Sequence, residues 1–180
     1  MPAIAPDFQQ DFFQLFDLPQ NFRLDNALLE RYYHALQEHV HPDKFSHLSE
    51  AERRVSMQWA MRVNEAYQTL SNPVRRARYL LSLHGVDIQE ESNTAMPADF
   101  LMEQMEWREA IEEARQARDT AELDTLESRL QQEIRSLESQ LATSIDDSRD
   151  YAAAAGDVRK LKFLEKLAEE IASAFDAIDT

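Results

Sequence analysis

The sequence predicts an all-α protein with short N-terminal helices and a C-terminal three-helix bundle. Two glycines, Gly85 and Gly156, occur in 180 residues, whereas sheet-rich and nucleotide-binding folds use glycine heavily in turns, bulges and phosphate loops. Apolar residues recur at intervals of three and four over long stretches of the chain, which is typical of helices that bury one face. Asp, Ser and Pro stand where several of these helices would begin.

The composition argues against several classes of protein. The chain contains no cysteine, so it has no disulfide framework, thiolate metal site or thiol nucleophile. Its formal net charge of −15 argues against nucleic-acid binding, because clustered Lys and Arg bind phosphate. A basic targeting segment and a long apolar run are both lacking, so we expect a soluble, cytoplasmic protein with no membrane partner.

The charge distribution divides the chain into two parts. Residues 1–90 carry 9 basic and 12 acidic side chains, a formal charge of −3, whereas residues 91–180 carry 10 and 22, a charge of −12. The apolar periodicity is lost within residues 84–96, and Pro97 closes this polar stretch. We therefore predict an N-terminal domain at 1–83, a connector at 84–96 and an acidic domain at 97–180.

The first two helices are bounded by local signals. A short apolar helix at 12–16 stops before Pro19, because the residue preceding a proline is disfavoured in the α region. A second helix runs from an Asp25 cap to about Val40, and Pro42 ends it.

Two further helices complete the N-terminal domain. The third begins at a Ser49 cap, with Glu52 completing a capping box. The fourth opens at Pro73 and ends just before Gly85. The buried face of the third helix is predicted to contain Val55, Trp59, Val63, Ala66, Tyr67 and Leu70.

The C-terminal domain is predicted to hold three long amphipathic helices, the first of which opens at Pro97. The apolar stripe of the second contains Leu123, Leu126, Leu130, Ile134, Leu137 and Leu141. The stripe of the third contains Leu161, Leu164, Ala168, Ile171, Phe175 and Ile178. Three such stripes can close one common core.

The tetrapeptide His41-Pro42-Asp43-Lys44 lies between the second and third helices. Proline fixes one backbone dihedral and lacks an N–H, so the flanking imidazole and carboxylate are presented from a stiff, non-helical backbone. This arrangement favours docking onto another protein surface.

The residues around this loop resemble the J-domain family. Residues 13–19 (FQLFDLP) are similar to the first helix of that family, and Tyr33 and Leu36 occupy core positions before the loop. Residues 63–73 (VNEAYQTLSNP) match the end of its third helix, and 75–79 (RRARY) look like its fourth. The four matches occur in the same order as in the family.

The remainder of the chain is similar to the HscB family, in which a J-domain is joined directly to a small acidic bundle. Residues 100–109 and 158–164 resemble that family's bundle motifs. The resemblance implies a co-chaperone without cofactor or catalytic chemistry. Its J-domain would stimulate the ATPase of an HscA-type chaperone, and its bundle would deliver the iron–sulfur scaffold protein IscU.

The resemblance also implies which residues contact the chaperone. The His-Pro-Asp loop maps to His41, Pro42 and Asp43, and Lys44 and Arg31 are added as cationic contacts. The chain departs from the family before the loop, where J-domains usually carry several Lys and Arg. Here Arg31, His34 and His39 are accompanied by Glu38.

The scaffold-binding face is predicted from the angular positions of side chains on the first bundle helix. At about 100° per residue, one arc carries Leu101, Met102, Met105, Glu106, Glu109 and Glu113. The opposite arc carries Phe100, Trp107 and Ile111, flanked by Ala110 and Ala114. We assign the aromatic arc to the core and the mixed arc to an exposed protein-binding site. Phe163, which lies off the stripe of its own helix, is assigned to the same exposed site.

Two alternatives remain open. His39, His41 and Asp43 fit an H-x-H-x-D pattern that supplies metal ligands in some metal-dependent hydrolases. Such sites need further ligands on a mixed α/β scaffold with glycine-rich loops. The remaining histidines are His34, His47 and His84, so this alternative is less favoured. The other is a J-protein that serves a general chaperone and a different client.

Overall fold

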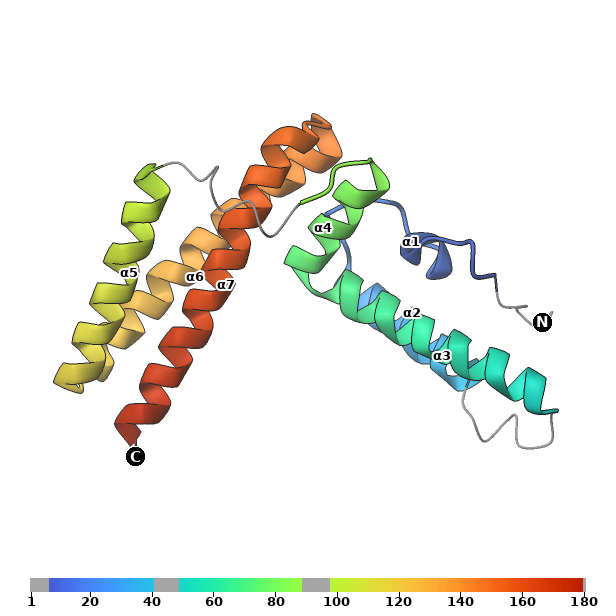
Figure 1. Ribbon diagram of the computed structural model, residues 1–180, viewed down its shortest axis with the longest axis horizontal. Coiled ribbons are helices and arrows are strands. Elements are labelled where there is room, and N and C mark those ends of the chain that lie inside the picture. The colour runs from blue at the N-terminus through green and yellow to red at the C-terminus, as the bar shows by residue number, and fades with distance from the viewer. Residues whose placement is uncertain (1–6, 41–48, 89–97, 180) are drawn as a thin grey trace. The chain divides into compact units, whose positions relative to one another are not determined.

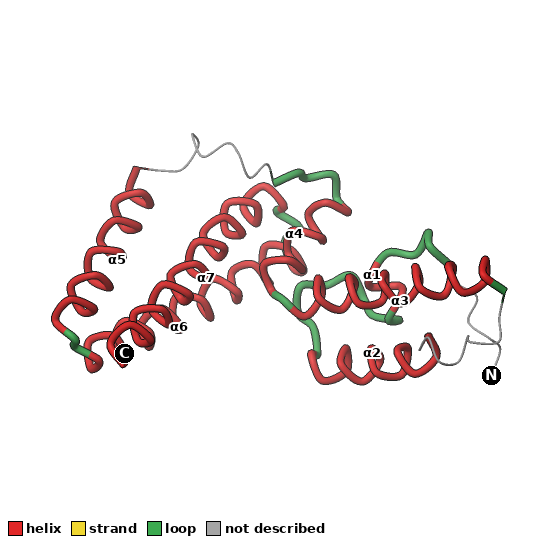
Figure 2. The backbone as a smooth tube through the Cα atoms, turned by 60° about the horizontal axis from the view of Figure 1, so that its bottom comes forward, coloured by secondary structure: helices red, strands yellow, loops and turns green. Residues whose placement is uncertain are grey.

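The computed structural model describes residues 7–40, 49–88 and 98–179, and in these ranges the chain consists of helices and loops without strands (Figures 1 and 2). Clustering of residue contacts gives two compact units, residues 1–80 and 81–180. The all-α class is confirmed. The boundary between the units falls within the helix Pro73–Leu83, upstream of the connector predicted at 84–96.

The first two helices begin at aspartate caps. Helix α1, Phe12–Leu15, is preceded by Asp11, whose carboxylate accepts hydrogen bonds from two N–H groups of the first turn at 2.8 and 2.9 Å. Helix α2, Asn26–Val40, is preceded by Asp25, whose carboxylate accepts from two N–H groups at 3.0 and 3.1 Å. The cap predicted at Asp25 is confirmed, because a short acceptor there satisfies donors that have no partner within the helix.

The third and fourth helices also follow their local signals. Helix α3, Glu50–Ser71, begins at a complete capping box in which Ser49 and Glu52 satisfy each other's backbone N–H groups. Helix α4, Pro73–Leu83, is followed by Gly85 in the left-handed region, with φ 75°. The predicted capping box and C-terminal glycine are therefore confirmed.

The core of the first unit centres on α3, where Trp59, Val63, Ala66 and Leu70 are buried as predicted. The prediction for Val55 is wrong, because its side chain is exposed. Packing on α3 begins one turn later, at Trp59, whose ring meets Phe8 edge-on at 5.5 Å. Tyr67 is only half-buried, and it stacks on Tyr33 with ring centroids 4.0 Å apart, which joins α3 to α2.

The second unit contains a three-helix bundle formed by α5 (Ala98–Ala117), α6 (Thr120–Ala142) and α7 (Tyr151–Asp179). Each helix contacts the other two (Figure 1). A π-helical turn, Thr143–Asp147, follows α6. Arg149, at φ 54°, then reverses the chain before α7. No helix in the described part of the chain is long and apolar enough to cross a membrane.

The predicted stripes of α6 and α7 fit the bundle core to different degrees. On α6 every predicted residue is buried except Ile134, which is half-buried. On α7 the prediction holds for Leu161, Leu164 and Ile171. Ala168, Phe175 and Ile178 are half-buried instead, and Leu167 and Ala174 fill the core. The core face is therefore rotated slightly from the predicted stripe, because α5 and α6 both pack on α7.

Candidate protein-docking sites

The first candidate site is carried by the hairpin of α2 and α3. His41, Pro42, Asp43 and Lys44 lie outside the described residues, in the segment that joins the end of α2 at Val40 to the Ser49 cap of α3. Side-chain contacts join the two helices of this hairpin. The Tyr33 hydroxyl donates to Asn64 Oδ1 at 2.8 Å, beside the Tyr33–Tyr67 stack, so both ends of the loop are attached to helices that are fixed against each other.

The exposed surface of α2 carries charges of both signs. Arg31 is exposed, as expected for a contact with a partner, and forms no ion pair within the described residues. The side chains of His34 and Glu30 lie 3.8 Å apart and are both largely exposed. Glu38 is also exposed. The described part of α2 therefore offers Arg31 as its one full cation, which agrees with the weakly basic character expected from the sequence.

The second candidate site is the outer face of α5. Leu101, Met102 and Met105 expose 43%, 61% and 71% of their areas, and Glu106, Glu109 and Glu113 are exposed beside them. The opposite arc is buried, with Phe100, Trp107 and Ile111 at 6%, 2% and 5% exposure. The predicted burial of the aromatic arc and exposure of the mixed arc are confirmed. Single exposed apolar residues are ordinary, but three neighbours rimmed by carboxylates are typical of a protein-binding site.

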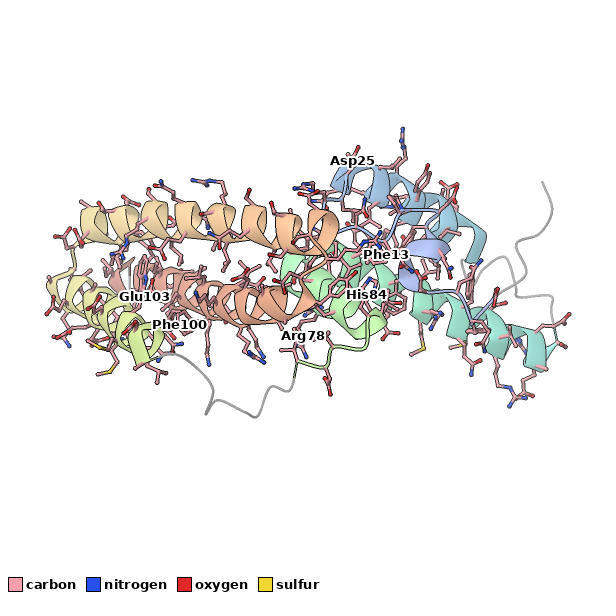
Figure 3. All side chains as sticks on the ribbon, turned by 90° about the horizontal axis from the view of Figure 1, so that it is seen from above. Phe13, Asp25, Arg78, His84, Phe100 and Glu103 are labelled. Carbon is pink, nitrogen blue, oxygen red and sulfur yellow. The ribbon has the colours of Figure 1, made fainter. Side chains whose placement is uncertain are left out.

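The exposure expected for Phe163 is wrong. Its side chain is 8% exposed and meets the Phe100 ring edge-on, with centroids 5.3 Å apart, where α7 packs on the first turn of α5. Figure 3 shows Phe100 at that end of α5. The apolar stripe of α7 does not predict this burial, because α5 covers a second side of that helix. The sequence does offer one sign of this contact, because Phe100 on the core-facing arc of α5 is an aromatic residue that can pack against Phe163.

Two cations that no sequence pattern singles out flank this aromatic pair. The Arg108 guanidinium lies 5.7 Å from the Phe163 ring centroid, and Lys160 Nζ lies 5.9 Å from that of Phe100. Cations over aromatic faces are attracted by the ring quadrupole, and they shield the rings from water. Arg108 and Lys160 thus help to keep the Phe100–Phe163 pair in the core and out of the exposed patch.

The uncompensated charge of the α5 face is negative. Arg108 Nε lies 3.5 Å from Glu170 Oε1, and Arg115 is paired with Glu112 at 2.7 Å. Hydrogen bonds from Arg115 and Gln116 lower the pKa of Glu112, so that carboxylate stays ionised and neutralises its partner. Glu106, Glu109 and Glu113 form no ion pair within the described residues. A partner that buries this face must therefore supply cations of its own.

The metal alternative gains nothing from the described residues, which contain no group of three or more His, Cys, Asp and Glu side chains able to hold a metal ion. His41, Asp43 and His47 lie outside those residues. His84 is engaged elsewhere, because its ring stacks on Tyr151 at 4.2 Å between centroids.

Comparison with known proteins identifies the family. Residues 96–172 match a family model described as the HSCB C-terminal oligomerisation domain. The "Co-chaperone protein HscB homolog" of Azoarcus sp. (strain BH72) is 53% identical over 98% of this chain and 99% of its own length. Chaperone HscB from Vibrio cholerae aligns with a TM-score of 0.85 at 39% identity, covering 94% of this chain and 99% of that one. Human co-chaperone protein HscB aligns with a TM-score of 0.87 at 33% identity, covering 95% of this chain and 87% of that one.

The helical hairpin followed by a separate acidic bundle, together with these matches, defines a J-domain co-chaperone. The chain belongs to the HscB family. The resemblance seen in the sequence is therefore confirmed over the whole chain, and so is the architecture that it implied.

Proposed function

We propose that this protein stimulates the ATPase of an HscA-type chaperone and delivers the iron–sulfur scaffold protein IscU to it, in the cytoplasm and without a reaction of its own. The observation that carries the proposal is the exposed apolar patch of α5, which lies in a different unit from the hairpin that bears the loop. Two separate surfaces suit a protein that brings two partners together.

The hairpin is the proposed chaperone-binding end. His41, Pro42 and Asp43 are the central contacts, with Lys44 and Arg31 as cationic neighbours. One support is that the chain belongs to the HscB family. The other is that the loop joins α2 to α3, and Tyr33 holds these two helices together through its contacts with Tyr67 and Asn64. A rigid hairpin reduces the conformational entropy that is lost when its loop docks.

The α5 face is the proposed scaffold-binding end. Leu101, Met102 and Met105 supply the apolar contact, while Glu106, Glu109 and Glu113 form the rim that selects a basic partner. Phe163 is not part of this face, because its ring is buried against that of Phe100. Apolar residues at the centre of an interface contribute most of the binding free energy, and exposed rim charges mainly affect association rate and salt dependence.

The proposal is tested by comparing partners. The full chain should raise the steady-state ATPase rate of an HscA-type chaperone more than that of a general DnaK, and scaffold protein should bind the same chain in calorimetry. Equal or greater stimulation of DnaK would favour the alternative J-protein with another client. One equivalent of tightly bound zinc or iron, with loss of helical signal on its removal, would favour the metal-dependent hydrolase.

A further inference from the structure

The methionine side chains carry all of the sulfur in this chain, which has six methionines and no cysteine. A peroxide that meets the protein therefore finds thioethers and no thiol. Four methionines lie in the described residues, and all four are exposed. Met57, Met61, Met102 and Met105 expose 60%, 70%, 61% and 71% of their areas. Their sulfur atoms are thus within reach of a dissolved oxidant.

The cores of both units are built without methionine in the part of the chain that the structure describes. The buried apolar side chains there are those of Phe, Leu, Ile, Val, Trp and Ala. Methionine commonly fills gaps in protein cores, where its sulfoxide would place a polar group among apolar ones. Oxidation of the four described methionines should therefore leave both units folded, and its effect is confined to what the exposed surfaces bind.

Met102 and Met105 supply two of the three apolar side chains of the α5 face. They are three residues apart on α5 and are therefore neighbours on its surface, and Leu101 directly precedes Met102. A sulfoxide is polar, and burying its oxygen against a partner that offers no donor costs affinity. Oxidation of both residues would thus make most of the apolar centre of this face polar.

The charge around this pair favours one class of oxidant. Glu106, Glu109 and Glu113 are exposed beside the methionines and form no ion pair within the described residues. Like charges repel, so these carboxylates oppose the approach of an anionic oxidant. Hydrogen peroxide and organic hydroperoxides are uncharged at neutral pH. A hydroperoxide therefore reaches the two sulfur atoms without electrostatic repulsion.

We propose that Met102 and Met105 form a reversible oxidation site that controls scaffold binding, with a hydroperoxide as the oxidant. The inference rests on the proposed function and adds to it the regulation of the α5 face. Scaffold protein binds the thioether form of the chain and is released from the sulfoxide form.

The chemistry of the site is a two-electron exchange in each direction. A lone pair of the sulfur attacks one peroxide oxygen, so that an S–O bond forms, the O–O bond breaks, and hydrogen peroxide leaves as water or an organic hydroperoxide as its alcohol. In reverse, a dithiol returns two electrons through a methionine sulfoxide reductase. The sulfoxide oxygen then leaves as water, and the dithiol becomes a disulfide.

The test treats the full chain with hydrogen peroxide and measures its affinity for the scaffold protein by calorimetry. Peptide mass spectrometry should find one added oxygen on Met102 and one on Met105. The dissociation constant should rise about tenfold or more, because the centre of the interface has become polar, while the helical signal and the unfolding temperature stay unchanged. Methionine sulfoxide reductases for both sulfoxide epimers, supplied with a dithiol, should restore the affinity of the untreated protein.

Two variants separate these sulfur atoms from the others. Met102→Leu with Met105→Leu keeps the apolar area without an oxidisable sulfur, so its dissociation constant should be the same before and after peroxide. Met57→Leu with Met61→Leu makes the same change on α3, where the side chains are equally exposed. This matched control should lose scaffold binding on oxidation as the wild type does.

The possible outcomes distinguish the inference from the proposed function. Oxidation of both sulfur atoms with unchanged scaffold affinity overturns the inference alone. A loss of affinity that persists in the Met102→Leu, Met105→Leu variant also overturns it, because another residue would be responsible. So does a fall in the unfolding temperature large enough to explain the lost binding. An untreated chain that does not bind the scaffold protein overturns the proposed function and the inference together.

Discussion

Trp107 and the exposed residues of α5 lie on one helix but serve opposite purposes. Trp107 is buried in the bundle, with the Arg129 guanidinium 4.5 Å from its ring centroid. Leu101 and Met105 are exposed. They precede Trp107 by about one and a half turns and about half a turn of the helix, respectively. Substitutions on the two arcs should therefore separate stability from binding.

We expect Trp107→Ala to lower the free energy of unfolding of the bundle by about 3–5 kcal/mol, because it leaves a cavity that the surroundings fill only in part. Leu101→Ala with Met105→Ala should leave unfolding nearly unchanged and weaken scaffold binding by an order of magnitude or more. Thermal unfolding and calorimetry with the scaffold protein measure the two effects. If the outcomes were exchanged, the inner and outer arcs of α5 would be assigned the wrong way round.

Phe163 shows where prediction from one helix fails. The angle between residues on α5 was enough to separate its two arcs, because each arc is a property of that helix alone. The burial of Phe163 depends on Phe100 from a different helix, and a periodicity carries no information about that contact. The substitution Phe163→Ala therefore belongs with Trp107→Ala, as a loss of packing.

The carboxyl group of Asp157 on α7 is partly buried, so its ionisation should affect the stability of the bundle. Partial burial raises the pKa of its carboxyl group above the usual 3.8, and nearby Lys160 opposes that rise. A raised pKa in the folded state favours the protonated form, so the stabilising contribution is present at low pH and is lost as the pH rises through the folded-state pKa. At neutral pH the ionised, partly buried carboxylate therefore destabilises the bundle.

Asp157→Asn should accordingly raise the unfolding temperature at pH 7, and the gain should shrink as the pH falls toward 3.8, where the wild-type carboxyl is increasingly neutral. Unfolding scans over that pH range measure the difference, with exposed Asp124→Asn on α6 as the control. A stabilisation of equal size at pH 3.5 and pH 7 would show that burial of the charge is not its cause.

At the scale of the helices, the termini were predicted better than the buried faces. The caps at Asp25 and Ser49 and the glycine after α4 depend on contacts within a few residues, so the sequence alone specifies them. Val55 and the rotated stripe of α7 depend on where neighbouring helices begin and end.

The capping box of α3 is expected to stabilise the hairpin that carries the loop. Ser49→Ala removes the oxygen that accepts from the Glu52 N–H and should lower the stability of the first unit by about 1 kcal/mol. Ser128→Ala, at an exposed position of α6, is the control and should cost less than half as much. Unfolding followed by the fluorescence of Trp59 reports on the first unit when Trp107 is replaced by Phe. Equal effects of the two substitutions would contradict the role of the cap.

At the scale of the whole chain, the two surfaces lie in different compact units with different charge. The sequence predicted this division from composition. The connector at 84–96 stays a prediction, and the boundary between the structural units falls within α4. Residues 81–83 of α4 group with the second unit, and directly after them His84 stacks on Tyr151. These two residues are 67 positions apart in sequence, so no local pattern reveals the contact.

A fragment that ends at Leu83 retains all of α4 and should separate the two activities. We expect it to stimulate the chaperone ATPase at high concentration, because it keeps the hairpin, and to show no measurable binding of the scaffold protein. The two measurements are an ATPase titration and calorimetry, with the full chain as reference. If the fragment bound the scaffold protein as tightly as the full chain does, the assignment of scaffold binding to the second unit would be wrong.

The most direct test of the co-chaperone account is the ATPase stimulation by His41→Gln in the full chain. The sequence predicts that His41 lies in a loop, so the free energy of unfolding should change by less than about 0.5 kcal/mol. Stimulation of the HscA-type ATPase should be abolished even at saturating concentration, while the scaffold protein binds as tightly as it does to the wild type. Stimulation that persists in the variant, or a loss of stimulation explained by earlier unfolding, would contradict the proposal that His41 acts at the chaperone surface.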